Sequence, residues 1–137
     1  MAFADTSYWV ALLSPRESLN DIAKVLTAEL QDKKVTLVTS SYIVAEVLDR
    51  FSKYGAAVRA AAKSLVDDLR IRTDVVFVEG SPDYVERALQ RYEEYKDKIW
   101  SFTDCSSVVI MLDLGITDAV TYDSDFEQAY FIAMMRH

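Results

Sequence analysis

Short apolar runs alternate with longer amphipathic segments along this chain, and the two patterns predict different elements. The apolar runs at residues 1–4, 34–39, 74–79 and 118–122 are typical of buried strands, and residues 130–135 are a candidate fifth strand. Apolar strands that alternate with helices favour a parallel sheet covered on both faces. We therefore predict an α/β fold, a three-layer α/β/α sandwich with a mainly parallel sheet of about five strands.

The segments between these runs carry apolar residues at helical spacing, together with helix start and stop signals. A helix from about Tyr8 should end at Ser14–Pro15, and Ser40 or Ser41 should cap another. Thr103 is a plausible cap for a helix that finishes at Gly115. The predicted buried faces are Leu19, Ile22, Ala23, Leu26 and Leu30; Val44, Val47, Leu48 and Phe51; Val85, Ala88, Leu89 and Tyr92; and Cys105, Val108, Val109 and Leu112.

Composition narrows the class of protein. With 137 residues, 51% of them hydrophobic, and only two prolines and three glycines, residues 1–137 read as a single domain. The net charge of -7 argues against binding nucleic acid by general basicity, but not against a nuclease whose site is neutralised by metal ions. A single cysteine, no membrane-length apolar run and no basic leader indicate a cytoplasmic protein with no membrane partner.

Several catalytic classes are excluded by residues that the sequence lacks. The sole histidine is His137, the last residue, which argues against a paired-histidine ribonuclease, a histidine-rich zinc site and a Ser-His-Asp hydrolase. The three glycines are isolated, so no phosphate-cradling loop is present. Cys105 has no histidine near it in sequence, and a buried, inert cysteine is the better interpretation.

Acidic residues follow the predicted strands in a way that suggests a site. Asp5 follows the first strand and Asp123 the fourth, with Asp125 close behind it. Asp104 opens the helix before the fourth strand, and Glu46 lies early in the helix after the second. Ligand sites of parallel sheets form beyond the carboxyl ends of the strands, so these acids can approach one edge. The strand order that would bring them together is not fixed by the sequence.

Each acid also has a purely structural interpretation. Asp5 could cap the helix that follows it, and Asp123 could be an ordinary turn residue. Asp104 would be favoured at a positive helix end without any function. Glu46 points away from the apolar face of its helix, so periodicity predicts a solvated side chain, which is still compatible with the rim of a cleft.

Four sequence motifs resemble those of the PIN domain family. The chain has Phe-Ala-Asp-Thr-Ser-Tyr at 3–8, Ser-Ser-Tyr-Ile-Val-Ala-Glu-Val at 40–47, Ser-Phe-Thr-Asp-Cys-Ser at 101–106 and Thr-Tyr-Asp-Ser-Asp-Phe-Glu-Gln-Ala at 121–129. They occur in the family's order and span nearly the whole chain. One departure is Tyr130, where many members have glycine. In size the chain most resembles the VapC-type toxin branch.

This resemblance implies a PIN-like fold and a metal-dependent ribonuclease. Its acidic pocket would be formed by Asp5, Glu46, Asp104 and Asp123, with Thr6, Ser7, Thr121 and Asp125 in supporting positions. Carboxylate oxygens suit Mg²⁺ or Mn²⁺, which keep several waters and also bind substrate phosphate. Acids crowded together would repel one another and raise their pKa values unless cations lie between them. The implied partners are an RNA substrate, an antitoxin protein and a second copy in a homodimer.

Two other functions remain open at this point. The first is a PIN-domain nuclease that processes RNA without an antitoxin. The second is a non-catalytic module that binds a single Mg²⁺ and acts through a partner, although no lysine follows the fourth strand as it does in receiver domains. Aromatic residues near the acids could stack on unpaired bases, and basic residues such as Lys96 and Lys98 could contact phosphates or simply be solvated.

Overall fold

The sheet of this protein is parallel throughout, as the apolar strands predicted. The computed structural model describes residues 1–16, 18–129 and 131–136. Within them, five strands pair in the order β3-β2-β1-β4-β5. The strands are β1 (Ala2–Ala4), β2 (Leu37–Ser40), β3 (Val75–Val78), β4 (Asp118–Val120) and β5 (Ile132–Ala133).

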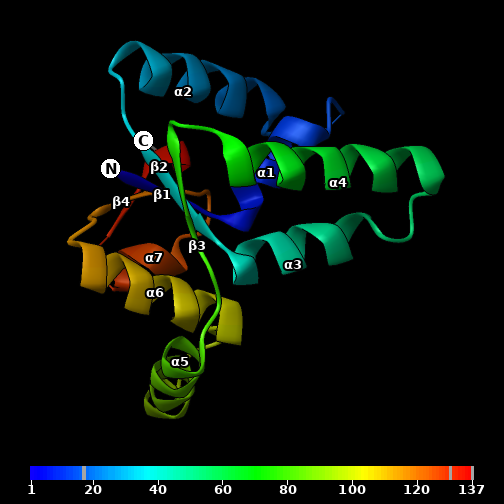
Figure 1. Cartoon of the computed structure of the whole chain (residues 1–137). Coiled ribbons are helices and arrows are strands. Elements are labelled where there is room, and N and C mark those ends of the chain that lie inside the picture. Colours follow the sequence, from blue (N-terminus) through cyan, green and yellow to red (C-terminus); the bar gives the residue numbers. More distant parts are fainter. Residues whose placement is uncertain (17, 130, 137) are drawn as a thin grey trace.

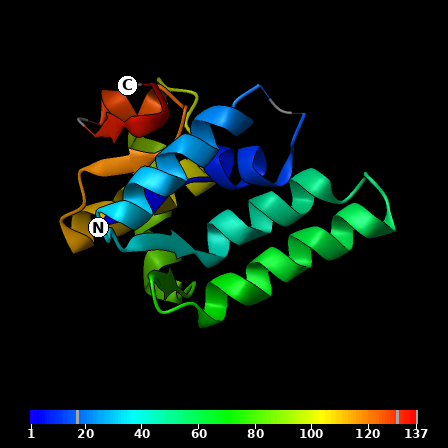
Figure 2. The same cartoon turned by 90° about the horizontal axis from the view of Figure 1, so that it is seen from above.

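Helices cover both sides of this sheet (Figure 1). Their bounds are α1 (Thr6–Leu13), α2 (Asn20–Asp32), α3 (Ser41–Phe51), α4 (Ala56–Ile71), α5 (Pro82–Glu94), α6 (Phe102–Leu114) and α7 (Asp125–Gln128). Helices α1, α2 and α4 lie on one side, and α5, α6 and α7 on the other. Helices α3 and α4 contact each other and extend as a pair beyond the sheet (Figure 2). The predicted three-layer sandwich is therefore confirmed.

The C-terminal segment differs in detail from the prediction. The fifth strand covers only Ile132–Ala133, and Met134–Arg136 form a 3₁₀ helix instead of continuing it. Tyr130, the predicted start of this strand, lies outside the described residues. The short helix α7 was not predicted from the sequence. A run of apolar residues alone does not separate a strand from a buried turn of helix.

Helix α6 begins two residues earlier than a Thr103 cap would place it. Ser101 is the N-cap, and a capping box joins it to Asp104, so the Thr103 assignment was wrong. The predicted apolar stripe was also incomplete, because every residue from Cys105 to Met111 is buried whereas Leu112 is 51% exposed. A helix enclosed between a sheet and another helix is buried on nearly all sides, which erases the helical period. Gly115 ends it in the left-handed conformation, with φ of 66°.

The predicted buried faces of three other helices are only partly buried. On α5 only Ala88 is buried, whereas Leu89 and Tyr92 are 48% and 53% exposed. Ile22 on α2 and Leu48 on α3 are exposed as well. Helix α5 packs on α6 rather than on the sheet, so it forms an outer layer with little to cover it. None of the helices in the described part of the chain is long and apolar enough to cross a membrane.

The strand order places a topological switch point at the centre of the sheet. From β1 the chain proceeds outward to β2 and β3, then returns to the other side of β1 for β4 and β5. The carboxyl ends of β1 and β4 are therefore adjacent, with Ala4 opposite Val120 in register. The residues that follow, Asp5 and Thr121, lie where parallel α/β sheets form ligand sites.

Candidate metal centre

Asp5 lies at the switch point with its carboxylate buried. It is 5% exposed, and its backbone N–H donates to the Val120 carbonyl at 3.2 Å. Although Asp5 occupies the N-cap position of α1, its side chain makes no helix-capping hydrogen bond. Instead, Asp5 Oδ2 accepts a hydrogen bond from the Thr121 hydroxyl at 2.8 Å. The simple capping interpretation therefore does not describe what this carboxylate does.

Two hydroxyl groups connect the ends of β1 and β4. Thr121 Oγ1 lies 3.0 Å from Ser7 Oγ and accepts a hydrogen bond from the Asp123 N–H at 3.0 Å. Ser7 Oγ in turn accepts from the Tyr122 N–H at 3.1 Å. The hydroxyls of Ser7 and Thr121 thus fix the backbone that carries Asp123 and orient Asp5, residues separated by more than a hundred positions.

Three aspartates meet beside this network. Asp104, Asp123 and Asp125 each offer a carboxylate oxygen, and these atoms all lie within 4.8 Å of one another. Asp104 Oδ2 accepts from the Ser101 N–H at 3.1 Å, and Asp123 Oδ1 accepts from the Asp125 N–H at 2.9 Å. Both therefore also serve the structural roles that sequence allowed, as a capping-box residue and a turn residue. Each carboxylate still has a second oxygen for a ligand.

Glu46 lies one and a half turns into α3 and is half-buried, so the prediction of a solvated side chain was only partly right. Its charge raises the pKa values of both Asp5 and Asp104. This electrostatic effect requires the Glu46 carboxylate to lie near Asp5 and Asp104. The four predicted acids therefore interact electrostatically at one edge of the sheet, and Asp125 joins them.

Burial makes the ionised forms of several acids in the site less favourable, which raises their pKa values. Desolvation raises the pKa of Asp5 from 3.8 to about 7, against the opposing effect of the hydrogen bonds it accepts. Burial likewise raises the pKa of Asp104 from 3.8 to about 6, and the charges of Asp123 and Glu46 add to the shift. The pKa of Asp125 is also raised, first by desolvation and then by Asp123. Ionising all of these groups together is therefore unfavourable.

No basic side chain neutralises these acids by direct contact. Among the ion pairs of residues 1–16, 18–129 and 131–136, none includes Asp5, Glu46, Asp104, Asp123 or Asp125. The Thr6 hydroxyl, next to Asp5, is buried without a hydrogen-bond partner in the described structure. A set of carboxylate oxygens with an unpaired hydroxyl nearby and no counterion fits a hard divalent cation.

The sequence analysis did not identify the hydrogen bonds that position Asp104 and Asp5. Ser101 was quoted within a motif, but its role as the cap that fixes Asp104 was not assigned. The Ser-x-x-Asp spacing from 101 to 104 is a capping-box signal that could have revealed it. The link from Thr121 to Asp5 had no sequence signal, because it depends on the adjacency of β1 and β4.

The fold and this acidic edge define the class. The family profile described as the PIN domain matches residues 2–132, and the chain belongs to that family. It is 32% identical over 135 residues to a protein of Mycobacterium tuberculosis (strain H37Rv) named "23S rRNA-specific endonuclease VapC20", covering 96% of both chains. The homologue from strain CDC 1551 / Oshkosh gives the same figures.

A solved structure agrees with this relationship. The crystal structure of Mycobacterium tuberculosis VapC20, described as a "Sarcin-Ricin loop cleaving toxin", matches with a TM-score of 0.84 and 28% identity. The match covers 96% of this chain and 97% of that one. The expected relationship to the VapC-type branch is thus confirmed.

Proposed function

We propose that this protein is a metal-dependent endoribonuclease that hydrolyses RNA phosphodiester bonds at the acidic edge of its sheet. The observation that carries the proposal is the convergence of carboxylates without counterions. Asp104, Asp123 and Asp125 lie within 4.8 Å of one another. The charge of Glu46 raises the pKa values of Asp5 and Asp104, and the charge of Asp104 also raises the pKa of Asp5. The naming of homologous proteins as endonucleases supports it.

The proposed roles follow from burial and hydrogen bonding. Asp5, Asp104 and Asp123 hold Mg²⁺ or Mn²⁺, and Glu46 either binds the ion or positions the attacking water. When bound, the ion supplies Lewis-acid activation of water and stabilisation of charge on the scissile phosphate. Thr121 and Ser7 orient the acids through their hydroxyls, and Thr6 and Asp125 are further candidate contacts to the ion or its waters. The reaction adds water at phosphorus and breaks the bond to the leaving oxygen.

The VapC20 proteins suggest which substrate should be tested first. These proteins are described as acting on 23S rRNA and on the sarcin-ricin loop. We propose that a structured RNA with an unpaired loop is also the substrate here. With a net charge of -7, the chain should bind RNA weakly, and binding should weaken further as salt increases.

The test compares cleavage by the native protein with cleavage by Asp104→Asn. This substitution keeps the shape of the side chain and an oxygen for the hydrogen bond from the Ser101 N–H. Purified proteins are incubated with a sarcin-ricin loop oligonucleotide in Mg²⁺ or Mn²⁺, with and without chelator. We expect cleavage that requires metal and falls at least about 100-fold in the variant, as for loss of a directly acting group.

A matched control is Asp67→Asn, which removes an exposed carboxylate from α4, on the opposite side of the sheet from α6. It should cleave at the native rate. Equal cleavage by native protein and Asp104→Asn would refute the site assignment. Cleavage that persists in chelator would refute the metal dependence.

We further propose that the protein is a homodimeric toxin restrained by an antitoxin and acts as a single domain. An apolar groove of about 660 Å³ supports such a partner. It is lined by residues of α1, α3, α4 and the segment after α1, including Leu13, Phe51 and Tyr54, with Arg16 and Arg50 among them. An amphipathic helix with acidic flanks would complement this groove. Sedimentation of the protein alone, and with the product of a neighbouring small reading frame, tests both partners.

A further inference from the structure

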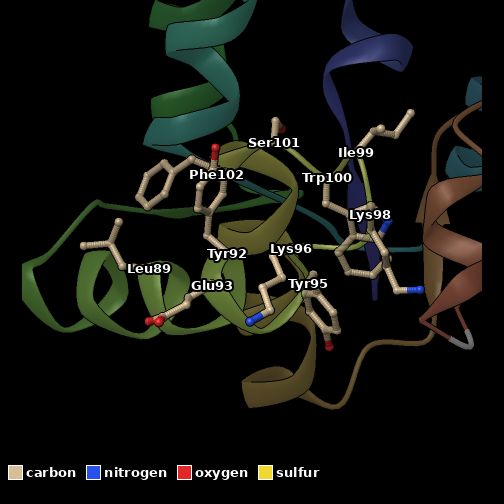
Figure 3. Close-up of a pocket in the computed structure, with 10 residues that line it drawn as sticks. All are labelled: Leu89, Tyr92, Glu93, Tyr95, Lys96, Lys98, Ile99, Trp100, Ser101 and Phe102. Atoms are coloured by element: carbon tan, nitrogen blue, oxygen red, sulfur yellow. The ribbon is translucent and has the colours of Figure 1, made fainter.

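A second groove of about 870 Å³ lies next to the acids, between the exposed side of α5 and the start of α6. Ten residues from Leu89 to Phe102 line it (Figure 3). They include Tyr92, Lys96, Lys98 and Trp100, and the proposed metal site uses none of them. The groove contains Leu89 and Tyr92, which sequence periodicity had assigned to the core.

Aromatic and apolar side chains form the walls of this groove. Tyr92 is 53% exposed and Ile99 is 92% exposed, whereas Trp100 is only 6% exposed. The Trp100 ring packs on Tyr95 with a centroid separation of 4.6 Å, which supports the wall of the groove. Phe102 is fixed from the far side by an edge contact to Tyr42 at 5.8 Å. An exposed tyrosine beside such a wall provides a flat surface for a planar ligand.

The charges at the groove favour an anionic ligand. Lys96 and Lys98 line it together with a single acid, Glu93, whereas the chain as a whole has a net charge of -7. Neither lysine forms an ion pair among the described residues. A locally cationic surface on an acidic protein concentrates phosphates at that place rather than over the whole molecule.

The groove is continuous with the acidic edge. Its last lining residues, Ser101 and Phe102, lead directly into Asp104, and the Ser101 hydroxyl accepts a hydrogen bond from the Asp104 N–H at 3.0 Å. A chain with phosphates at regular intervals can therefore occupy the groove and the acidic edge at once.

We propose that this groove binds unpaired nucleotides next to the scissile phosphate, with Tyr92 stacking on a base and Lys96 and Lys98 contacting phosphates. Single-stranded RNA is the ligand that combines planar apolar faces with regularly spaced negative charge. The inference rests on the proposed ribonuclease function and adds the surface that positions the substrate. Tyr92, Lys96 and Lys98 are binding residues rather than catalytic ones.

The first measurement is binding without cleavage. Fluorescence anisotropy with a labelled single-stranded RNA of about 10 nucleotides is recorded in chelator, a length within the usual site sizes. Tyr92→Ala should weaken binding about 5-fold to 100-fold, as expected for loss of one stacked base. The double variant Lys96→Ala/Lys98→Ala should weaken binding and reduce the slope of log affinity against log salt by about 0.7 per lost phosphate contact.

The control variants remove exposed side chains at positions away from the groove. Ile71→Ala removes an apolar side chain that is 80% exposed, at the end of α4. Lys24→Ala/Lys33→Ala removes two exposed lysines at α2. Both controls should bind the RNA as the native protein does. If they lose as much affinity as the groove variants, the proposal is wrong, because binding is then spread over the surface.

Single-turnover cleavage in Mg²⁺ or Mn²⁺ separates this inference from the function on which it rests. The groove variants should raise the protein concentration needed for half-maximal rate and leave the maximal rate nearly unchanged. Asp104→Asn should lower the maximal rate and leave binding intact. Metal-dependent cleavage with unaltered binding in all groove variants overturns the groove and leaves the nuclease standing. Equal cleavage by Asp104→Asn and native protein overturns the nuclease.

Sedimentation of the same variants identifies a protein occupant. If Tyr92→Ala lowers the mass from dimer to monomer and RNA affinity is unchanged, the groove is an interface between copies and the proposal fails. If native mass is kept and RNA affinity falls, the proposal is supported.

Discussion

The burial of Asp5 predicts that this carboxylate destabilises the metal-free protein, and that the effect depends on pH. Its pKa is about 7 in the folded protein against 3.8 for the ordinary group. The folded state therefore binds a proton more tightly than the unfolded chain does. The stability contributed by this group is highest below about pH 4, falls as the pH rises and becomes constant above about pH 7.

The size of the effect follows from the shift. Each unit of pKa corresponds to 1.36 kcal/mol, so Asp5 should cost the folded state about 4 kcal/mol near pH 8, where it is ionised, and about 2 kcal/mol near pH 5, where it stays protonated. Asp5→Asn removes the charge and keeps an oxygen for the hydrogen bond from the Thr121 hydroxyl. We expect the variant to be more stable than the native protein by about 1–4 kcal/mol near pH 8, and by clearly less near pH 5.

The assay is urea unfolding in chelator at both pH values, followed by tryptophan fluorescence. The readout is the difference in unfolding free energy between the native protein and Asp5→Asn. Asp67→Asn, at an exposed position, is the control and should change stability equally little at both pH values. A difference for Asp5→Asn that stays constant with pH, or a variant that is less stable near pH 8, would refute the reasoning.

Two further predictions concern the same acids. Mg²⁺ or Mn²⁺ should raise the melting temperature more near pH 8 than near pH 5, because protons compete with the cation for Asp5 and Asp104 at the lower pH. Differential scanning fluorimetry measures this rise. A larger rise near pH 5 would contradict the prediction. Thr121→Val removes the hydroxyl that donates a hydrogen bond to Asp5 and accepts one from the Asp123 N–H. It should therefore lower the free energy of unfolding by about 1–3 kcal/mol and slow cleavage. Unchanged unfolding and cleavage would count against the positioning role of this hydroxyl.

The sequence predicted the layers of this fold better than its packing. Short apolar runs were sufficient for the parallel sheet, because strands buried on both faces lose the alternation of half-buried ones. Helical periodicity did less well: Leu112 was placed in the core and is exposed, and Tyr92 lines a groove instead of the interior. Periodicity reveals an apolar face but not what covers it, and α5 packs mainly on α6.

The residues of the candidate site were predicted from the sequence, but their arrangement in space was not. Sequence position suggested that Asp5, Glu46, Asp104 and Asp123 could approach one edge of the sheet, and the family resemblance implied that they form one pocket. Their convergence depends on β4 lying beside β1, which no local pattern encodes. The hydroxyl link between Ser7 and Thr121 depends on the same pairing. Long-range strand order is therefore the information that the sequence lacked.

The position of the basic residues relative to the acids is itself an argument for how the site works. A lysine or arginine within the cluster would stabilise the carboxylates and occupy the place of a divalent cation. Instead, the pKa values of Asp5, Asp104 and Asp125 are raised, and Lys96 and Lys98 line the adjacent groove. On the proposed function, cation binding would restore stability that burial removes, and the lysines would remain available for phosphates. The same arrangement makes metal affinity and RNA affinity separable by mutation, since different residues contribute to each.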